Sequence, residues 1–431
     1  MNRQGRSLLA DIAGVLGSHV LAMAAVLGLS VLLSRTLGPE GYGIYTSLFA
    51  LPMIVMGLVQ LGLSRSAIYF LGNRLYPEGK VIASIYILLI FSSIAGVIIT
   101  GAGYVIVANP HFKVLWMGLI LAGIPFMLGN IYTGGIFIGK EQIPVANRLQ
   151  WMPVTINILL ASLLVWALGW GITGALLSTL IATVFVFIIG FLRVRRTFSF
   201  EPGFYPEILH SLASKGFVYA INFVMLQVNY KVDVVLLQRM VEPRQIGYYS
   251  LGVSITEQLW LLPYAIGIVL MSRTANSPDK QRMAGTTALM LRTSIPASVL
   301  GALALVLLAP VFLPLIFGEK FLPSIKVVQT IIPGVVIFMI YRIIESYYAG
   351  SGNPLLSVRI LIPAAVLNIL LNIWWIPRWG ILGSAWATNV SYTAATLAFL
   401  FSFKKDSGLP LSQILLPRLG DWQHLGRRLQ R

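Results

Sequence analysis

The chain has 431 residues, of which 57% are hydrophobic and 10% are charged, and its mean hydropathy is +0.83. Soluble proteins carry about 25% charged residues, so this composition indicates a chain solvated mostly by lipid. No polar stretch reaches the ~50 residues that a small soluble domain needs, so no separate soluble domain is expected. The absence of cysteine excludes disulfides and thiolate metal sites.

Apolar runs separated by short Gly-, Pro- or charge-containing breaks predict the membrane-spanning elements in chain order. Each run exceeds the roughly 20 residues that span the hydrocarbon core as a helix, and none shows the alternation of a barrel strand. Six helices are predicted before a basic connector and six after it: 11–34, 44–71, 81–108, 114–139, 145–168 and 171–192, then 212–238, 246–272, 285–317, 324–350, 354–376 and 381–403.

The distribution of Lys and Arg predicts the orientation. With the N-terminus inside, the inner segments hold about three times as many Lys and Arg residues as the outer loops, which is the bias of cytoplasmic loops. Both termini are therefore expected in the cytoplasm, and the net charge of +17 reports topology rather than nucleic-acid binding. The predicted organisation is an N-terminal lobe (1–192), a cytoplasmic linker (193–210), a C-terminal lobe (211–403) and a basic cytoplasmic tail (404–431).

One predicted turn occurs twice in the sequence. "VLLSRTLGPEGYGIY" (31–45) and "VLLQRMVEPRQIGYY" (235–249) align without a gap and share Val, Leu, Leu, Arg, Pro, Gly and Tyr. Two further echoes keep the same order: "NILL" at 157 and 368, and "WGITGALLST" and "WGILGSAWAT" from 170 and 379. Repetition at a fixed spacing indicates a duplicated unit.

The repeat predicts a parallel arrangement of the two halves. Each unit has six helices, an even number, so both copies enter the membrane from the same side and are related by an axis along the membrane normal. Two such bundles with a cleft between them suit alternating access. The sequence therefore predicts an all-α integral membrane transporter with 12 transmembrane helices in two six-helix lobes.

Several stretches resemble the polysaccharide-transporter, or oligosaccharide flippase, branch of the multidrug/oligosaccharidyl-lipid/polysaccharide (MOP) superfamily. They are "SRTLGPEGYGIYTSLFAL", "NYKVDVVLLQRMVEPRQIGYYSLGVSITEQLWLLP", "LLAPVFLPLIFGEKFLPS" and "GSGNPLLSVRILIPAAVLNILLNIWWIPRWGILGSAWATNVSY". The resemblance covers nearly the whole chain and implies the MATE-like MOP fold. It also implies a cargo, a polyprenyl-pyrophosphate-linked oligosaccharide moved from the inner to the outer leaflet for cell-surface polysaccharide biosynthesis. Members often carry a basic residue, a spacer and Asp in helix seven, here Lys231 and Asp233, and a Glu in helix eight, here Glu257.

Ionisable residues at membrane depth are costly and usually face a bundle interior or water. Arg suits a pyrophosphate because its planar fork binds two oxygens at once. Three basic residues are predicted to bind the anionic head group, and three acidic residues are predicted ion-coupling groups or partners in structural pairs: Arg65, Arg342 and Lys231, then Asp233, Glu257 and Glu345.

Each candidate also has a structural interpretation. Arg342 and Glu345 stand three apart on one helical face and can neutralise each other, and Lys231 can pair with Glu257. Asp233 can cap or be solvated near the outer end of its helix, and Arg65 can snorkel to the interface. Most aromatic residues are expected at interfaces; Trp260, Tyr264 and Tyr341 are among those able to stack on sugars.

Two other classes remain to be weighed. A cation-coupled multidrug antiporter shares the fold and would want acidic residues in its cleft. A membrane glycosyltransferase or polymerase would need catalytic groups on a sizeable outer loop, and neither such a loop nor a metal-ligand, phosphate-loop or nucleophile motif is present; no enzyme is predicted. No cofactor or metal is expected, and coupling to H⁺, Na⁺ or the membrane potential stays open. The expected partners are the lipid-linked substrate, membrane lipids and a polysaccharide polymerase or assembly protein, with no nucleic acid, in the plasma (inner) membrane.

Overall fold

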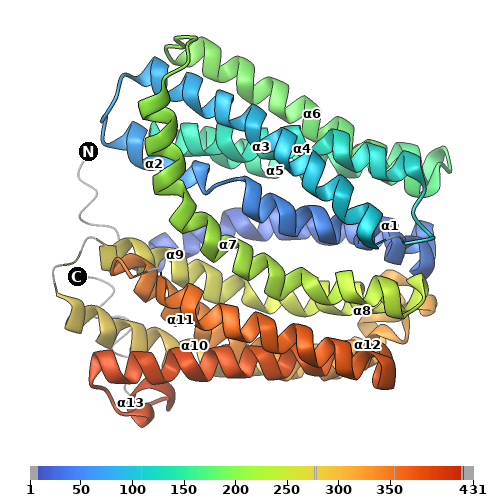
Figure 1. Ribbon diagram of the computed structural model, residues 1–431. Coiled ribbons are helices and arrows are strands. Elements are labelled where there is room, and N and C mark those ends of the chain that lie inside the picture. The colour runs from blue at the N-terminus through green and yellow to red at the C-terminus, as the bar shows by residue number, and fades with distance from the viewer. Residues whose placement is uncertain are drawn as a thin grey trace. The chain divides into compact units, whose positions relative to one another are not determined.

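The computed structural model describes residues 8–107, 109–275, 277, 279–353, 355–418 and 421, and all its regular structure over these residues is helical (Figure 1). A backbone in lipid must satisfy its own N–H and C=O groups, and a helix does so within one segment. The first half comprises α1 (Leu8–Val59), α2 (Leu63–Gly72), α3 (Glu78–Val107), α4 (Val114–Gly139), α5 (Ile143–Ala161), the π-helix η2 (Ser162–Ala167) and α6 (Gly171–Thr197).

The second half continues the helical pattern to the C-terminal region. Its long helices match the predicted segments to within a few residues, except that α7 starts earlier, at a Pro in its first turn. The elements are α7 (Pro206–Met240), α8 (Pro243–Thr256), the 3₁₀ turn η3 (Glu257–Trp260), α9 (Leu261–Ala275), α10 (Lys280–Phe317), the 3₁₀ turn η4 (Glu319–Phe321), α11 (Ser324–Gly350), α12 (Leu355–Ser407) and α13 (Leu411–Leu415).

Within the described ranges, ten helical stretches are long and apolar enough to cross a membrane. Two helices are far longer than one crossing needs: α1 has 52 residues and α12 has 53. A straight helix of that length would extend roughly 78 Å, against a hydrocarbon core of about 30 Å. Each contains one glycine with non-helical backbone, Gly38 (φ 67°) in α1 and Gly380 (φ 57°) in α12. Both glycines lie in turns that the sequence predicts between helices. Glycine suits these positions because it adopts positive φ without steric cost.

The second predicted helix, 44–71, is not continuous in the structure. It is interrupted at residues 60–62, where Gly62 adopts the left-handed conformation (φ 57°). The Gln60 carbonyl accepts the Leu63 N–H within this turn at 3.0 Å, and its second lone pair can accept one more donor. The hydroxyl of Tyr132, fully buried on α4, donates to that carbonyl at 3.0 Å and lies 3.0 Å from Ser92 Oγ. The prediction of one unbroken helix was wrong, because an isolated Gly in an apolar run is usually tolerated within a helix and does not predict a break.

The predicted helix 246–272 is also interrupted near its middle. Four residues, Glu257–Trp260, form the 3₁₀ turn η3 between α8 and α9. Trp260 ends this turn, and its indole Nε1–H donates to the Val335 carbonyl of α11 at 3.0 Å. A mid-helix 3₁₀ segment often marks a functional hinge, and here it contains the predicted site residue Glu257.

By its internal packing the chain divides into two compact units, Ala24–Gly247 and Tyr248–Arg431 together with Met1–Met23. In Ala24–Gly247, α4 packs against α2, α3, α5 and α6, and α7 packs against α2 and α3. In Tyr248–Arg431, α11 is central and packs against α9, α10 and α12. Its core is aromatic: Phe338 stacks on Tyr341 and Tyr392 with ring centroids 4.4 and 4.1 Å away.

The repeated Asn makes the same kind of contact in both halves. Asn157 Nδ2 on α5 donates to Thr179 Oγ1 on α6 at 3.1 Å. Asn368 Nδ2 on α12, before the kink, donates to Ser391 Oγ, after the kink, at 3.0 Å. Polar side chains often hydrogen-bond across helices in membrane proteins, so the "NILL" echo corresponds to the same kind of contact in both halves of the chain.

Around Asn368 the contact extends into a network. Asn372 Nδ2 donates to Asn368 Oδ1 at 3.0 Å, and Ser384 Oγ donates to Asn372 Oδ1 at 2.7 Å. All four side chains, including Ser391, are fully buried. Such a network is costly when only partly satisfied.

Replacing Asn368 with alanine should therefore destabilise the protein more than replacing Asn157, which makes one side-chain bond. We expect a loss of about 1–3 kcal/mol for Asn368→Ala, because its partners are left buried and unpaired. Thermal unfolding of the two variants in one detergent measures the difference. An equal melting temperature for both would contradict the network.

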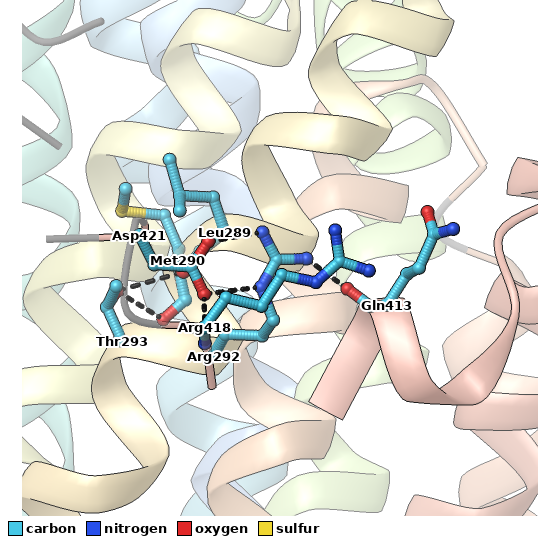
Figure 2. Close-up of polar contacts among 7 residues, drawn as sticks. All are labelled: Leu289, Met290, Arg292, Thr293, Gln413, Arg418 and Asp421. Atoms are coloured by element: carbon cyan, nitrogen blue, oxygen red, sulfur yellow. Dashed lines mark hydrogen bonds and ion pairs between the residues drawn. The ribbon is translucent and has the colours of Figure 1, made fainter. Parts of the chain in front are cut away.

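Past α12 the described chain returns to α10 (Figure 2). Arg292 of α10 donates through Nε and Nη2 to the two carboxylate oxygens of Asp421, both at 2.8 Å, and also to the Gln413 carbonyl. The two side chains of the pair are 12% and 6% exposed. Hydrogen bonding to Arg292 lowers the pKa of the Asp421 carboxyl below its ordinary value. We call this contact of Arg292 on α10 with Gln413 and Asp421 the C-terminal latch.

The latch should be sensitive to acid. Because the folded-state pKa of Asp421 is lowered, the carboxylate stabilises the latch above its unfolded pKa of about 3.9 and loses that contribution as the pH falls through the folded value. At pH 7, Asp421→Asn should speed amide hydrogen exchange in residues 411–418 by about tenfold or more. The difference from wild type should shrink below pH 3.9. Glu319→Gln, at an exposed position, is the matched control; unchanged exchange in Asp421→Asn would contradict the latch.

Candidate functional site

In Ala24–Gly247, the predicted site residue Arg65 makes a side-chain contact with a second helix. It stands on α2, three residues after the left-handed Gly62, and its guanidinium lies over the ring of Tyr219 on α7, 5.5 Å from the centroid. The two helices can approach because each presents a glycine: a Cβ on Gly62 would lie 2.3 Å from the Gly216 carbonyl oxygen. Arg65 itself is exposed, so its planar fork remains accessible to an anion.

Lys231 and Asp233 stand on the same helix, α7, but away from Arg65. Lys231 is 12 residues past Tyr219, which is roughly 18 Å along the helix axis. Lys231 is half-buried, whereas Asp233 is 3% exposed and its Oδ1 accepts the Val234 N–H at 2.7 Å. α7 thus carries one predicted site near Tyr219 and another more than three turns away.

In Tyr248–Arg431 the structure brings Arg342 close to η3. Its guanidinium lies over the indole ring of Trp260, 4.6 Å from the centroid. Glu257 stands three residues before Trp260 in the same 3₁₀ turn, and side chains three apart in such a turn eclipse each other. Glu345 follows Arg342 by three residues on α11, on one helical face. This unit therefore brings Arg342 against Trp260 at one interruption of a membrane helix, with Glu257 in the same 3₁₀ turn and Glu345 one turn after Arg342 on α11.

Each unit thus holds an arginine within its membrane helices over an aromatic ring. A cation over a ring face gains about 0.5–2 kcal/mol and keeps its guanidinium at a fixed place, while N–H groups at the rim can still donate to an anion. Both rings, Tyr219 and Trp260, come from an element other than the one that carries the arginine. Tyr219 was missed by the sequence reasoning, because no local pattern tells which helix packs on α2.

Of the three aromatic residues named for sugar stacking, only Tyr264 is exposed, at 41%. Trp260 and Tyr341 are buried, and their rings pack in the aromatic core. A buried ring offers no open face to a sugar, so Tyr264 is the remaining candidate of the three.

The two copies of the repeated turn, 31–45 and 235–249, contact each other. Gly43, after Pro39, and Gly247, after Pro243, are packed backbone to backbone: a Cβ on Gly43 would lie 1.9 Å from the Pro243 carbonyl oxygen, and one on Gly247 would lie 2.0 Å from the Pro39 carbonyl oxygen. The contact is reciprocal. Neighbouring Ile246 is 1% exposed, so the two turns are tightly closed on each other.

A pocket of about 800 Å³ lies where α3 and α7 end and α8 begins. Arg239 lines it and donates through Nε to the Val107 carbonyl at 3.0 Å, at the C-terminal end of α3. Asn109, His111 and Glu242 are among its polar lining residues. None of the six predicted site residues lines this pocket, and by the predicted topology it opens at the outer surface.

Comparison with known proteins identifies a family and a relative of this chain. Residues 8–270 match the family model described as "Polysaccharide biosynthesis protein". A Shigella flexneri protein named "Putative O-antigen transporter" is 22% identical over 389 residues, which cover 86% of this chain and 92% of that protein.

Two solved structures are similar over nearly the whole chain. One is an inward-facing multidrug resistance MATE family transporter of the MOP superfamily, with a TM-score of 0.73, 16% identity and coverage of 90% of this chain and 94% of that one. The other is the lipid II flippase MurJ in an inward closed conformation, with a TM-score of 0.73, 17% identity and coverage of 96% and 90%. The chain thus has the MATE- and MurJ-like MOP fold, in an all-helical membrane protein of about 10–12 helices.

Proposed function

The chain belongs to the polysaccharide biosynthesis protein family, and we propose that it is a flippase that moves a polyprenyl-pyrophosphate-linked oligosaccharide from the inner to the outer leaflet. The observation that carries the proposal is the match, over 86% of this chain, to the protein named "Putative O-antigen transporter". The resemblance to oligosaccharide flippases of the MOP superfamily is confirmed by these comparisons. The chain is a multi-pass membrane protein of a transporter family and not an enzyme.

The proposed architecture has twelve spans in two six-helix lobes. Counting α1 and α12 as two spans each, divided at Gly38 and Gly380, turns the ten apolar stretches into twelve. The paired turns and the paired Asn157 and Asn368 contacts support a duplicated, parallel repeat. The same proposal puts both termini in the cytoplasm and the protein in the plasma membrane, with lobes over 1–192 and 211–403, linker 193–210 and tail 404–431.

The physics of the cargo matches the cations. The apolar prenyl tail can stay in the hydrocarbon core of the bilayer, so only the pyrophosphate and the sugar need a polar path across the membrane. Arg65 and Arg342 can each hold phosphate oxygens through a bidentate fork, and the ring beneath each one fixes its position. Lys231 is the next candidate cation, and Asp233, Glu257 and Glu345 are proposed as ion-coupling groups or structural partners.

A transport assay tests the proposal. Purified protein in vesicles should move a labelled lipid-linked oligosaccharide between leaflets and should not expel cationic drugs. A cation-coupled multidrug antiporter is the second candidate, because the MATE transporter fits the fold as well as MurJ does, at a TM-score of 0.73 each. Drug efflux driven by an H⁺ or Na⁺ gradient, with no leaflet transfer of the labelled lipid, would favour that candidate instead.

A further inference from the structure

A second cation–aromatic pair lies beside Arg65, and neither of its two residues was predicted to be part of the site. Lys215 of α7 places its ammonium 3.9 Å from the ring centroid of Tyr69 on α2. The first pair is Arg65 of α2 over Tyr219 of α7, at 5.5 Å. The two contacts are crossed, since each helix supplies one cation and one ring. We name these four residues the α2–α7 ladder.

Helix spacing gives the ladder two steps. Arg65 and Tyr69 are four residues apart on α2, and Lys215 and Tyr219 are four apart on α7, so each pair shares one helical face. Four residues correspond to about 6 Å along a helix. By the predicted topology α2 runs inward and α7 runs outward, which sets the Lys215–Tyr69 step one turn nearer the cytoplasm than the Arg65–Tyr219 step.

The ladder rests on a rigid helix crossing. Gly216 and Gly62 allow the two backbones to touch, because a Cβ on Gly216 would lie 2.0 Å from the Leu61 carbonyl oxygen. The buried Ser66 hydroxyl donates to the Leu212 carbonyl across the same crossing at 2.8 Å. These contacts fix the relative register of α2 and α7, so the positions of the two cations are set by the fold.

The charge on the ladder is not neutralised by the described part of the protein. Neither Arg65 nor Lys215 has a carboxylate of any described residue within salt-bridge distance. Both side chains are exposed, and Tyr69 is 39% exposed. Two uncompensated cations about one turn apart, each beside a ring, suit a ligand that carries two adjacent phosphates and a polar group able to stack.

We propose that the α2–α7 ladder is the entry site for the pyrophosphate head of the lipid cargo, with Lys215 making the first contact and Arg65 the second. The inference rests on the proposed function and adds Lys215 and Tyr69 to the substrate-binding residues. The shared chemistry is a lipid phosphate, and a bilayer phospholipid also offers one. A single phosphodiester needs one cation, whereas a pyrophosphate engages both steps, and this favours the cargo.

Binding of a short-chain polyprenyl-pyrophosphate disaccharide to the full-length protein in neutral-lipid nanodiscs tests the ladder. Lys215→Ala should weaken binding about tenfold, as loss of one charge-assisted contact does, and Lys215→Arg should restore it. Tyr69→Leu, which removes the ring face next to the Lys215 ammonium, should weaken it less. Lys405→Ala removes a predicted cytoplasmic, exposed charge elsewhere and serves as the matched control; it should bind as wild type.

The arms separate the sources of failure. Wild-type affinity in Lys215→Ala, with transport intact, would overturn the ladder and leave the proposed function standing. An effect of Lys215→Ala seen equally with phosphatidylglycerol and with the pyrophosphate lipid would reassign the ladder to bilayer phospholipid and overturn the proposal. Failure of the wild-type protein to bind or move any lipid-linked oligosaccharide would instead remove the proposed function itself.

Discussion

Arg65→Ala should remove most transport of the lipid-linked oligosaccharide while leaving the fold intact. Arg65 is exposed and its described contact is the face of Tyr219, so its removal leaves no buried group unpaired. Loss of a charge-assisted bond costs about 1.5–3 kcal/mol, which weakens binding by roughly one to two decades. Arg65→Lys should recover only part, because a point charge lacks the bidentate fork.

Arg342→Ala should lower transport as well, but this variant needs a fold control. Arg342 is half-buried over Trp260, so truncation also removes packing from the indole. Arg342→Lys, which keeps the charge, and Arg342→Met, which keeps the volume, separate the two contributions. Transport by well-expressed variants is the measurement. Normal transport by both Arg65→Ala and Arg342→Ala would mean that the phosphate is held elsewhere, with Lys231 the next candidate.

The second large effect is expected at the paired turns. Gly43→Ala or Gly247→Ala puts a methyl group about 2 Å from a backbone carbonyl oxygen of the opposite turn, far inside van der Waals contact. The two backbones must separate, at a cost of about 1–3 kcal/mol or more. If closure of these turns is one step of alternating access, either substitution should slow transport strongly and populate the open arrangement.

Gly118→Ala is the control for this pair, since no heavy atom lies within 4 Å of a Cβ there. The chain has no cysteine, so Tyr42→Cys with Ile246→Cys gives a direct readout of closure. We expect cross-linking that depends on substrate in the parent and falls in Gly247→Ala. Cross-linking at the parental yield in Gly247→Ala would show that the turns need no glycine contact, and no cross-linking in any state would leave them as structural elbows.

The duplicated turns and the helix positions could be predicted because they depend on local chemistry. Pro39 and Gly43 stop one helix and permit the next, whatever the helices pack against. Gly380 is a similar case. The repeat also pointed to Asn157 and Asn368, since Asn is costly in lipid unless it finds a partner. What it finds, Thr179 in one half and Ser391 in the other, is visible only in the structure.

The missed contacts all depend on which helices meet. In lipid, apolar residues surround a helix on every side, so periodicity does not reveal its buried face. Nothing local indicates that α7 packs on α2, and therefore Tyr219 and Lys215 could not be found as partners of Arg65 and Tyr69. The interruption at residues 60–62 was missed because a single Gly in an apolar run is usually tolerated within a helix. The Tyr132 hydroxyl that donates to the Gln60 carbonyl there comes from another helix.

Leaflet transfer in reconstituted vesicles tests the central claim most directly. A lipid-linked oligosaccharide labelled on its sugar is placed in one leaflet, and its exposure to an impermeant sugar-oxidising enzyme is followed with time. We predict fast exposure with wild-type protein, a rate reduced at least tenfold with Arg65→Ala, and a wild-type rate with Lys405→Ala. Exposure no faster than in protein-free vesicles, from protein shown to be folded, would contradict the assignment as a flippase.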